Sequence, residues 1–321
     1  MLRRDFISCA GLLLTSSVAS AQSDYPNRPV RILNPFAPGG SGDIVVRTVI
    51  QKISQNTGKS FAIEVRSGAA GKIGYEAGTR SAPDGHTLVI TDTTFTMLPA
   101  LQSQLHWQST DALSPVAVLV SSPFLILVRP ELKVGSLKDF IEMARANPGK
   151  FNYGSAGIGS INHIATELFK QEARLHLTHV PFKGMTEAVA AILGDQLDVI
   201  LIGILPVSAH IKAGKLVPLA VASPQRLSSL PTIPTADEAG VPGYRAGNWF
   251  GLTAPKGTPT EYLDWLHRQC EQALSSPEVR ERLLAAGLVP ATSTREQFGK
   301  TMEDDAKRWA NVIRTAGIRA E

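Results

Sequence analysis

Buried strand patterns and amphipathic helix patterns alternate along almost the whole chain. Short apolar runs typical of buried strands lie at residues 30–34, 61–65 and 197–202, and apolar residues recur at helical spacing at residues 43–55 and 160–172. Parallel strands need a crossover connection, and a helix is the usual one. The alternation therefore predicts an α/β fold with mixed, mostly parallel sheets flanked by helices.

Two breaks in this pattern predict where the chain crosses between two lobes. The apolar run at residues 116–128 is interrupted by Ser121, Ser122 and Pro123, and a second break lies at residues 243–249. Two crossings make a hinge, with a ligand cleft between the lobes. The expected division is residues 22–123 and 247–321 for the first lobe and residues 124–246 for the second. Three C-terminal helices that return to the first lobe are predicted at residues 259–274, 277–286 and 295–315.

The first 21 residues have the composition of an export signal peptide. Arg3 and Arg4 precede an apolar stretch too short to span a bilayer of about 30 Å, and small residues at positions 19–21 form a cleavage site. We therefore expect a periplasmic protein, exported by either the Sec or the twin-arginine route. Cys9 would leave with the signal peptide, so the mature chain keeps Cys270, expected to be an inert, partly buried thiol.

Composition, together with motifs that lack a required residue, excludes several classes of protein. The chain is 43% hydrophobic and 19% charged, as globular proteins are, and its net charge of +4 is spread without basic runs, which argues against nucleic-acid binding. Residues 39–43 lack the last glycine of a hydrolase elbow, and residues 157–162 lack the third glycine of a dinucleotide fingerprint. The histidines show no metal-ligand spacing. We expect a monomer that is not an enzyme and holds no cofactor or metal.

The strongest local signal is a Gly/Ser-rich loop at residues 35–43, between a predicted strand and a predicted helix. A helix N-terminus offers amide donors without partners and a partial positive charge, which suits a carboxylate. Ser41 adds a hydroxyl donor, whereas Asp43 is expected to cap local amides or orient the loop. The other interpretation is a tight turn without a ligand. The candidate ligand-binding residues here are Pro38, Gly39, Gly40, Ser41 and Asp43.

A second loop of the same kind occupies residues 153–160. Its candidate ligand contacts are Ser155, Ala156 and Gly157, together with Ser160, which fits either an N-cap or a ligand contact. His163 lies in the first helical turn, where the helix dipole disfavours a protonated ring. It either donates from its neutral form to a carboxylate or is a satisfied structural histidine. Two such loops in two lobes would clamp an anion across the cleft.

The chain resembles the receptors of tripartite tricarboxylate transporters, the Bug family, through many motifs in one order. They include Tyr25-Pro26-x-Arg28-Pro29-Val30-Arg31, Pro35-Phe36-Ala37-Pro38-Gly39-Gly40, Ala82-Pro83-Asp84-Gly85-His86-Thr87-Leu88, Asn152-Tyr153-Gly154-Ser155-Ala156-Gly157, His179-Val180-Pro181-Phe182-Lys183-Gly184 and Ala254-Pro255-x-Gly257-Thr258-Pro259. The resemblance implies a two-lobe, type II periplasmic-binding-protein fold. It further implies that the loops at residues 38–43 and 155–160 hold a carboxylate through backbone amides and waters, for delivery to a membrane permease.

The resemblance adds further pocket residues and leaves the ligand open. The added candidates are Asp92, Thr93, Gly203 and Trp249. Asp92 either selects an amino group or caps a loop end, and Trp249 either stacks on a ring or belongs to the hinge or core. Asn34 stands where the family has an apolar strand residue. Such departures leave the ligand class open among dicarboxylates, tricarboxylates, amino acids and aromatic acids.

Two alternatives to a transport receptor remain. One is a sensing receptor, in which the same closed form contacts a signalling partner. The other is a small serine hydrolase that uses Ser41 or Ser155 with His163. It requires a serine within hydrogen-bond reach of a histidine that a carboxylate orients.

Overall fold

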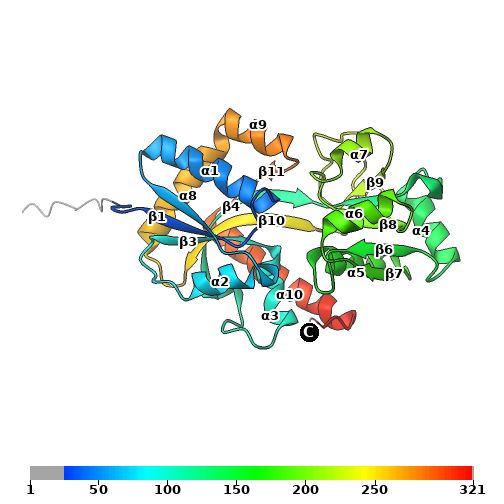
Figure 1. Cartoon of the computed structure of the whole chain (residues 1–321), viewed down its shortest axis with the longest axis horizontal. Helices are drawn as coiled ribbons and strands as arrows, with labels where there is room; N and C mark the ends of the chain where they lie inside the picture. The colour runs from blue at the N-terminus through cyan, green and yellow to red at the C-terminus, as the bar shows by residue number, and fades with distance from the viewer. Residues whose placement is uncertain (1–24, 320–321) are drawn as a thin grey trace, which may run out of the picture.

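The computed structural model describes residues 25–319, so the predicted signal peptide lies outside the described residues. Two lobes lie side by side along the long axis, each built on one β-sheet with helices on its faces (Figure 1). The first sheet, in the spatial order β11-β4-β10-β3-β1-β2, contains β1 (Val30–Asn34), β2 (Phe61–Val65), β3 (Thr87–Asp92), β4 (Leu113–Pro123), β10 (Gly247–Pro255) and β11 (Val289–Pro290). The second, in the order β7-β6-β8-β5-β9, contains β5 (Leu125–Val128), β6 (Asn152–Ser155), β7 (Thr178–Pro181), β8 (Val199–Ile202) and β9 (Val217–Val221).

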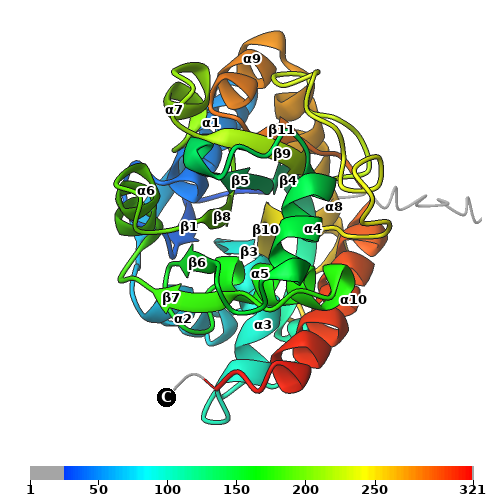
Figure 2. The ribbon, with the colours of Figure 1, turned by 90° about the vertical axis from the view of Figure 1, so that its right-hand side faces the viewer.

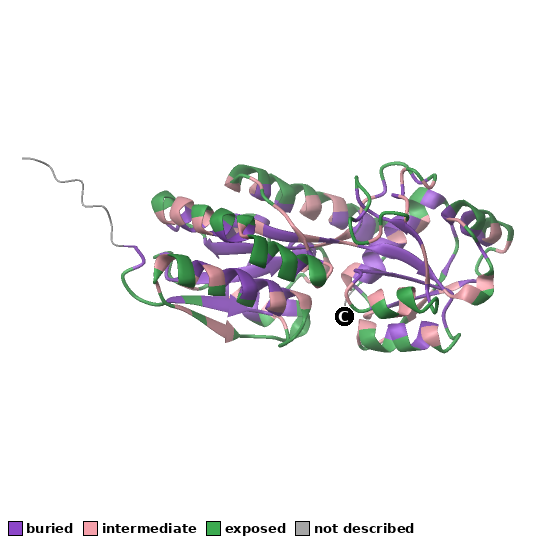
Figure 3. Cartoon of the chain, turned by 90° about the horizontal axis from the view of Figure 1, so that it is seen from above, coloured by how far each residue is buried: buried purple, intermediate pink, exposed green. Residues whose placement is uncertain are grey.

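Helices connect most of these strands, as the alternation predicts. They are α1 (Ser41–Thr57), α2 (Lys72–Thr79), α3 (Thr93–Leu101), α4 (Leu137–Ala146), α5 (Ile161–Ala173), α6 (Met185–Leu193), α7 (Ser208–Lys212), α8 (Thr260–Ser275), α9 (Pro277–Ala285) and α10 (Arg295–Thr315). Short 3₁₀ turns lie at η1 (Ala69–Gly71), η2 (Thr110–Ala112) and η3 (Pro130–Leu132). The helices expose their outer faces and bury most strands of each lobe, whereas the edge strands β2 and β7 stay partly exposed (Figure 3). Among the described residues, no helix combines the length and the apolar character needed to cross a bilayer.

Both sheets are mixed. β1 pairs in parallel with β2 and β3, and β6 pairs in parallel with β7 and β8. The antiparallel pairs of the described chain all involve β4, β5 or β10. These strands make the crossings: β4 leads through Phe124 into β5, and β10 brings the chain back beside β4 (Figure 1). An outgoing and a returning strand that lie side by side must be antiparallel, so parallel pairing is confined to the strands outside the hinge.

The last helix, α10, packs on both lobes. Phe298 and Met302 in its first half join a cluster of buried side chains of the first lobe. Trp309, Val312 and Ile313 in its second half join the main core of the second lobe. Figure 2 shows α10 running along α3 and α5, which it contacts. The end of α10 therefore packs on the second lobe, although it belongs to the segment predicted for the first; the lobe boundaries stay a prediction.

Replacing Trp309 with alanine tests how far α10 contributes to the second core. Because Trp309 is buried, we expect Trp309→Ala to lower the free energy of unfolding by roughly 3–5 kcal/mol, through the cavity that it leaves. Urea denaturation followed by circular dichroism measures the change. Lys300→Ala, on an exposed position of the same helix, is the control and should cost less than about 0.5 kcal/mol. Equal stabilities of the two variants would contradict the assignment.

Candidate functional site

The strand registers place the two Gly-containing loops on edges that face each other. Phe250, near the start of β10, pairs with Asp92 at the end of β3, so the end of β3 points toward the crossing. β1 and β2 run parallel to β3 and end at the same edge. In the second lobe, Leu125 at the start of β5 pairs with Ile202 at the end of β8, and β6 runs parallel to β8. The loops after β1, β2 and β3 therefore face the loops after β6 and β8.

Asp43 fixes the shape of the loop before α1. Its carboxylate accepts hydrogen bonds from the Gly39 amide at 3.0 Å, from Asn34 Nδ2 at 2.9 Å and from Arg47 Nε at 2.9 Å. Burial alone would raise the pKa of Asp43, but the bonds from Arg47 and Gly39 lower it below its ordinary value. Gly39 is left-handed, with a φ of 79°, which suits a residue without a side chain. The Asp43 carboxylate thus accepts its hydrogen bonds from groups in or next to its own loop.

The N-terminus of α1 keeps amide donors without partners. Its N-cap, Gly40, has no side chain to cap the helix. The backbone amides of Ser41, Gly42 and Asp43 form no hydrogen bond with any other group in the described part of the chain. Such amides, at the positive end of a 17-residue helix, favour a bound anion. The loop therefore has both the shape and the free donors of a carboxylate site.

The loop before α5 is closed by its own side chains. Ser160 is the N-cap: its Oγ accepts from the His163 amide at 3.3 Å and donates to the Gly157 carbonyl at 2.7 Å. Ser155 is fully buried, and its Oγ shares a hydrogen bond of 2.6 Å with His179 Nε2. The hydroxyl of Ser155 also lies 3.1 Å from the Gly157 carbonyl oxygen. Both serines therefore hold the loop in shape, and Ala156 lies between these fixed points.

Two stacked histidines are hydrogen-bonded to this loop. His163 Nδ1 accepts the Gly159 amide at 3.1 Å, which places the ring proton on Nε2 and requires a neutral ring. The rings of His163 and His179 stack with centroids 3.9 Å apart, and Tyr153 stacks on His179 at 4.8 Å. Burial, and then the neighbouring His179, lower the pKa of His163 to about 4. Burial also lowers the pKa of His179.

The role of His179, which appears in the sequence only as part of a motif, was not expected. The residue lies in β7, and the β6–β7 register pairs it with Tyr153 and brings its ring to Ser155. The hydrolase alternative pairs Ser41 or Ser155 with His163, and neither serine is hydrogen-bonded to that ring among the described residues. Instead His179 is the partner of Ser155, and no carboxylate of the described residues is hydrogen-bonded to His179. The constellation that a serine hydrolase requires is not assembled here.

A third group of polar residues joins β3, α3 and β10. Asp92 is buried and caps α3 by accepting from the Thr94 amide at 2.9 Å. It also accepts from the Tyr75 hydroxyl at 2.7 Å and from Asn248 Nδ2 at 2.9 Å. Burial raises the pKa of Asp92, although these hydrogen bonds act in the opposite direction. Thr93 completes the group, since its amide donates to Asn248 Oδ1 at 3.0 Å. Tyr75 was not expected from the sequence.

Gly203 and Trp249 both lie at the hinge. A side chain at Gly203 would come within 2.7 Å of Ser122 Oγ, so the loop after β8 lies directly against the end of β4. The Trp249 indole donates to Asp305 of α10 at 2.8 Å and packs edge-on against Phe298. Its ring is therefore directed into the first-lobe core.

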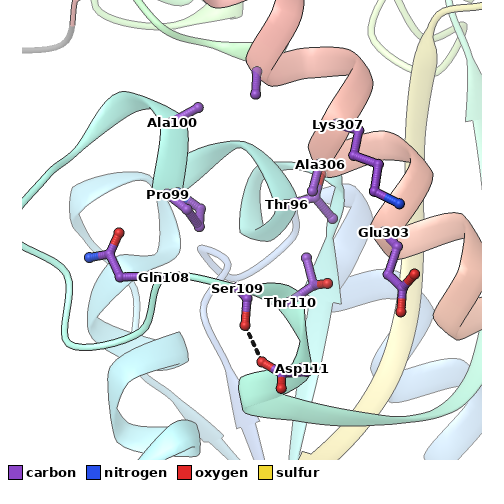
Figure 4. Close-up of a pocket in the computed structure, with 11 residues that line it drawn as sticks. Thr96, Pro99, Ala100, Gln108, Ser109, Thr110, Asp111, Glu303, Ala306 and Lys307 are labelled. Atoms are coloured by element: carbon purple, nitrogen blue, oxygen red, sulfur yellow. Dashed lines mark hydrogen bonds between the residues drawn. The ribbon is translucent and has the colours of Figure 1, made fainter.

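A separate groove of about 620 Å³ lies between α3 and α10 (Figure 4). Its lining includes Pro99 and Ala100 of α3 and Ala306 and Lys307 of α10. None of the site residues expected from the sequence lines it. The groove is thus distinct from the facing loops.

Comparison with known proteins identifies the family. Residues 45–318 match the family described as "Tripartite tricarboxylate transporter family receptor". The chain belongs to this family. The receptor is 32% identical to the protein BugT of Bordetella pertussis over 316 residues, which cover 98% of this chain and 96% of BugT.

Solved structures agree with this assignment. MatC from Rhodopseudomonas palustris, solved with bound malate, is 30% identical, with a TM-score of 0.75 over 90% of this chain and 100% of MatC. A second R. palustris protein, solved with adipate, is 32% identical, with a TM-score of 0.78 over 92% of this chain and 99% of the other. These likenesses confirm the predicted two-lobe periplasmic-binding-protein fold of the receptor.

The neutral His163 makes the stability of the receptor depend on pH. The unfolded chain takes up this proton at about pH 6.5, whereas the folded form does so at a pKa of about 4. The contribution of His163 to stability is therefore fully present above pH 6.5 and is lost as the pH falls toward 4. In His163→Asn the amide oxygen still accepts the Gly159 amide but does not titrate.

We expect this variant to lose less stability than the wild type between pH 7.5 and 4.5, by at least about 1 kcal/mol. Urea denaturation at the two pH values measures both losses. The comparison cancels the titration of all other groups, which the two proteins share. Equal losses would mean that His163 is not held neutral by its surroundings.

Proposed function

We propose that the protein is a periplasmic receptor that captures a small carboxylate-bearing molecule between its lobes and delivers it to the membrane permease of a tripartite tricarboxylate transporter. The observation that carries the proposal is the N-terminus of α1, where the amides of Ser41, Gly42 and Asp43 are without partners on an edge that faces the second lobe. A carboxylate is the complementary group. The relatives with bound malate and adipate support the same ligand class.

In the proposed clamp the first lobe supplies donors and the second lobe closes over them. Charge-assisted hydrogen bonds from backbone amides, enclosed away from water, are sufficient for micromolar affinity, about 8 kcal/mol. Neutral His163 can donate from Nε2 without the cost of a buried charge, because its Nδ1 is already occupied. The residues proposed to surround the ligand are Pro38, Gly39, Gly40, Ser41, Thr93, Ala156, Gly157, His163 and Gly203. We propose that Asp43, Asp92, Ser155 and Ser160 shape the site through the bonds that they already make.

The proposed mechanism is lobe closure without chemistry. Ser155 is fully buried, and no carboxylate of the described residues is hydrogen-bonded to His179 to orient it, so Ser155 is a poor nucleophile. A sensing role would use the same closed form with another partner. We further propose that residues 1–21 direct export and are then removed, and that the mature receptor acts as a monomer.

The first test is a calorimetric titration of the exported, processed protein. The protein is purified from the periplasm, then unfolded and refolded to remove any ligand carried over, with circular dichroism to verify refolding. The panel contains dicarboxylates, citrate, amino acids, nicotinate and aromatic acids. We expect saturable binding of one class with a Kd in the micromolar range or below. Folded protein that binds no member of the panel would overturn the carboxylate assignment.

A matched pair of glycine variants tests whether the loop before α1 holds the ligand. Gly39 and Gly58 lie at opposite ends of α1, have φ values of 79° and 67°, and would each place an added methyl group in open space. Alanine should therefore strain both positions alike, by about 1 kcal/mol. We expect Gly39→Ala to weaken ligand binding at least fivefold, because it displaces the amides that follow, and Gly58→Ala to leave the Kd unchanged. Equal affinities of the two variants would place the ligand elsewhere.

A further inference from the structure

The exposed apolar side chains of this protein gather on the facing edges of the lobes. Among the described residues, the large apolar side chains that stay exposed are Ile158 (59%), Ile73 (49%), Val65 (37%) and Leu284 (37%). Val65 ends β2, and Ile73 lies two residues after η1, both at the edge of the first lobe that faces the second. Ile158 lies in the loop after β6 on the opposite edge. Leu284 lies near the end of α9, outside the loops after β1, β2, β3, β6 and β8.

Ile158 is held outward by a fixed loop. It lies between Gly157 and Gly159, which have φ values of 104° and 78°. The loop is fastened on both sides, since Gly159 donates to His163 and the Gly157 carbonyl accepts from Ser160. An exposed isoleucine on a mobile loop would need no explanation. Here the backbone holds the side chain at the tip of the loop.

The opposite edge presents a matching apolar surface. Ala69 and Ala70 of η1 are exposed, and both adopt left-handed backbone angles, with φ values of 47° and 54°. Two consecutive alanines in this region are strained by roughly 1–2 kcal/mol each, and such strain tends to persist at functional segments. Ile73 lies beside this turn, since a side chain at Gly68 would come within 2.7 Å of its Cδ1. Together Ala69, Ala70 and Ile73 form an exposed apolar surface.

The strand orders place these two surfaces in the outer halves of their sheets, after the fourth strand of the first and the third strand of the second. From the crossing strands outward, the first sheet runs β10, β3, β1, β2 and the second runs β5, β8, β6, β7. Viewed along the long axis, α2, which directly follows η1, lies on the same side of the molecule as β6 and β7 (Figure 2). The segments after β2 and after β6 therefore lie far from the hinge, where closure moves the lobes most.

We propose that Ile158 and the surface formed by Ala69, Ala70 and Ile73 are a closing latch, two apolar surfaces that pack against each other when the lobes close. The latch rests on the proposed function, because it stabilises the closed form that encloses the ligand. It touches no ligand. It therefore adds the same factor to the affinity for every ligand that closes the receptor, and leaves the choice between ligands to the pocket.

A disulfide tests the contact without relying on any ligand. The double variant Ile73→Cys with Ile158→Cys should form an intramolecular disulfide under mild oxidation, which requires the two Cα atoms to approach to about 4.4–6.8 Å. Cys270 does not compete, because it is fully buried and burial raises the pKa of its thiol to about 12. Leu284→Cys with Ile158→Cys is the control pair and should remain reduced. Mass spectrometry of the intact protein under non-reducing conditions shows whether each of the two double variants has formed the disulfide.

Ligand affinity provides the second test. We expect Ile158→Ser and Ile73→Ser each to weaken binding about fivefold, by the same factor for every ligand that binds. The two substitutions together should weaken it little more than either alone, because they remove one shared contact. Leu284→Ser should have no effect. Circular dichroism verifies that the variants are folded.

The outcomes separate the latch from the proposed function. Disulfide formation without binding of any carboxylate would support the latch and overturn the ligand class. Binding of a carboxylate without disulfide formation would overturn the latch and leave the proposed function in place. Unequal losses for different ligands would show that Ile158 contacts the ligand, which also overturns the latch.

Discussion

The antiparallel ladder between β4 and β10 determines how the rest of the molecule is arranged. It runs from Gly247 opposite Pro123 to Pro255 opposite Leu113, so one strand leaves the first lobe beside the point where the other returns. A side chain at Gly247 would come within 2.7 Å of the Ser122 carbonyl oxygen, so the crossing backbones lie too close for anything but glycine. β3 pairs antiparallel with β10, and β1 runs parallel to β3; β5 continues the chain from β4 and pairs antiparallel with β8, and β6 runs parallel to β8. The loops after β1 and β6 therefore end up on opposing edges.

The two loops of the proposed clamp differ in whether their helix N-terminus is capped by a side chain. In the first lobe, the carboxylate of Asp43 shapes the loop from within and leaves the first amides of α1 without partners. In the second lobe, Ser160 caps its helix, and stacked His163 and His179 fill the space beneath the loop. The first loop therefore has donors to offer, whereas the second has a fixed shape. In the proposed clamp, this asymmetry favours capture by the first lobe followed by closure of the second.

The sequence predicts the parts of this protein that depend on local chemistry. The strand after which each Gly-containing loop begins, and the helix N-cap at Ser160, follow from residue type and spacing. Contacts made across strands do not. His179 reaches Ser155 only through the β6–β7 register, and Tyr75 reaches Asp92 from a helix 17 residues earlier. Asn34 was visible as a departure from the family, but its bond to Asp43 required the fold.

Most polar side chains near the facing loops are already engaged with one another, and this bears on selectivity. Asp43 is paired with Arg47, Ser155 with His179, and Asp92 with neutral donors that enclose it. An enclosed carboxylate is not available to bind a ligand amine. Backbone amides, in turn, accept any carboxylate, which fits relatives that hold acids as different as malate and adipate. In the proposed clamp, discrimination between acids therefore arises from the segments that meet the ligand only on closure, at the end of β8 and the start of β10.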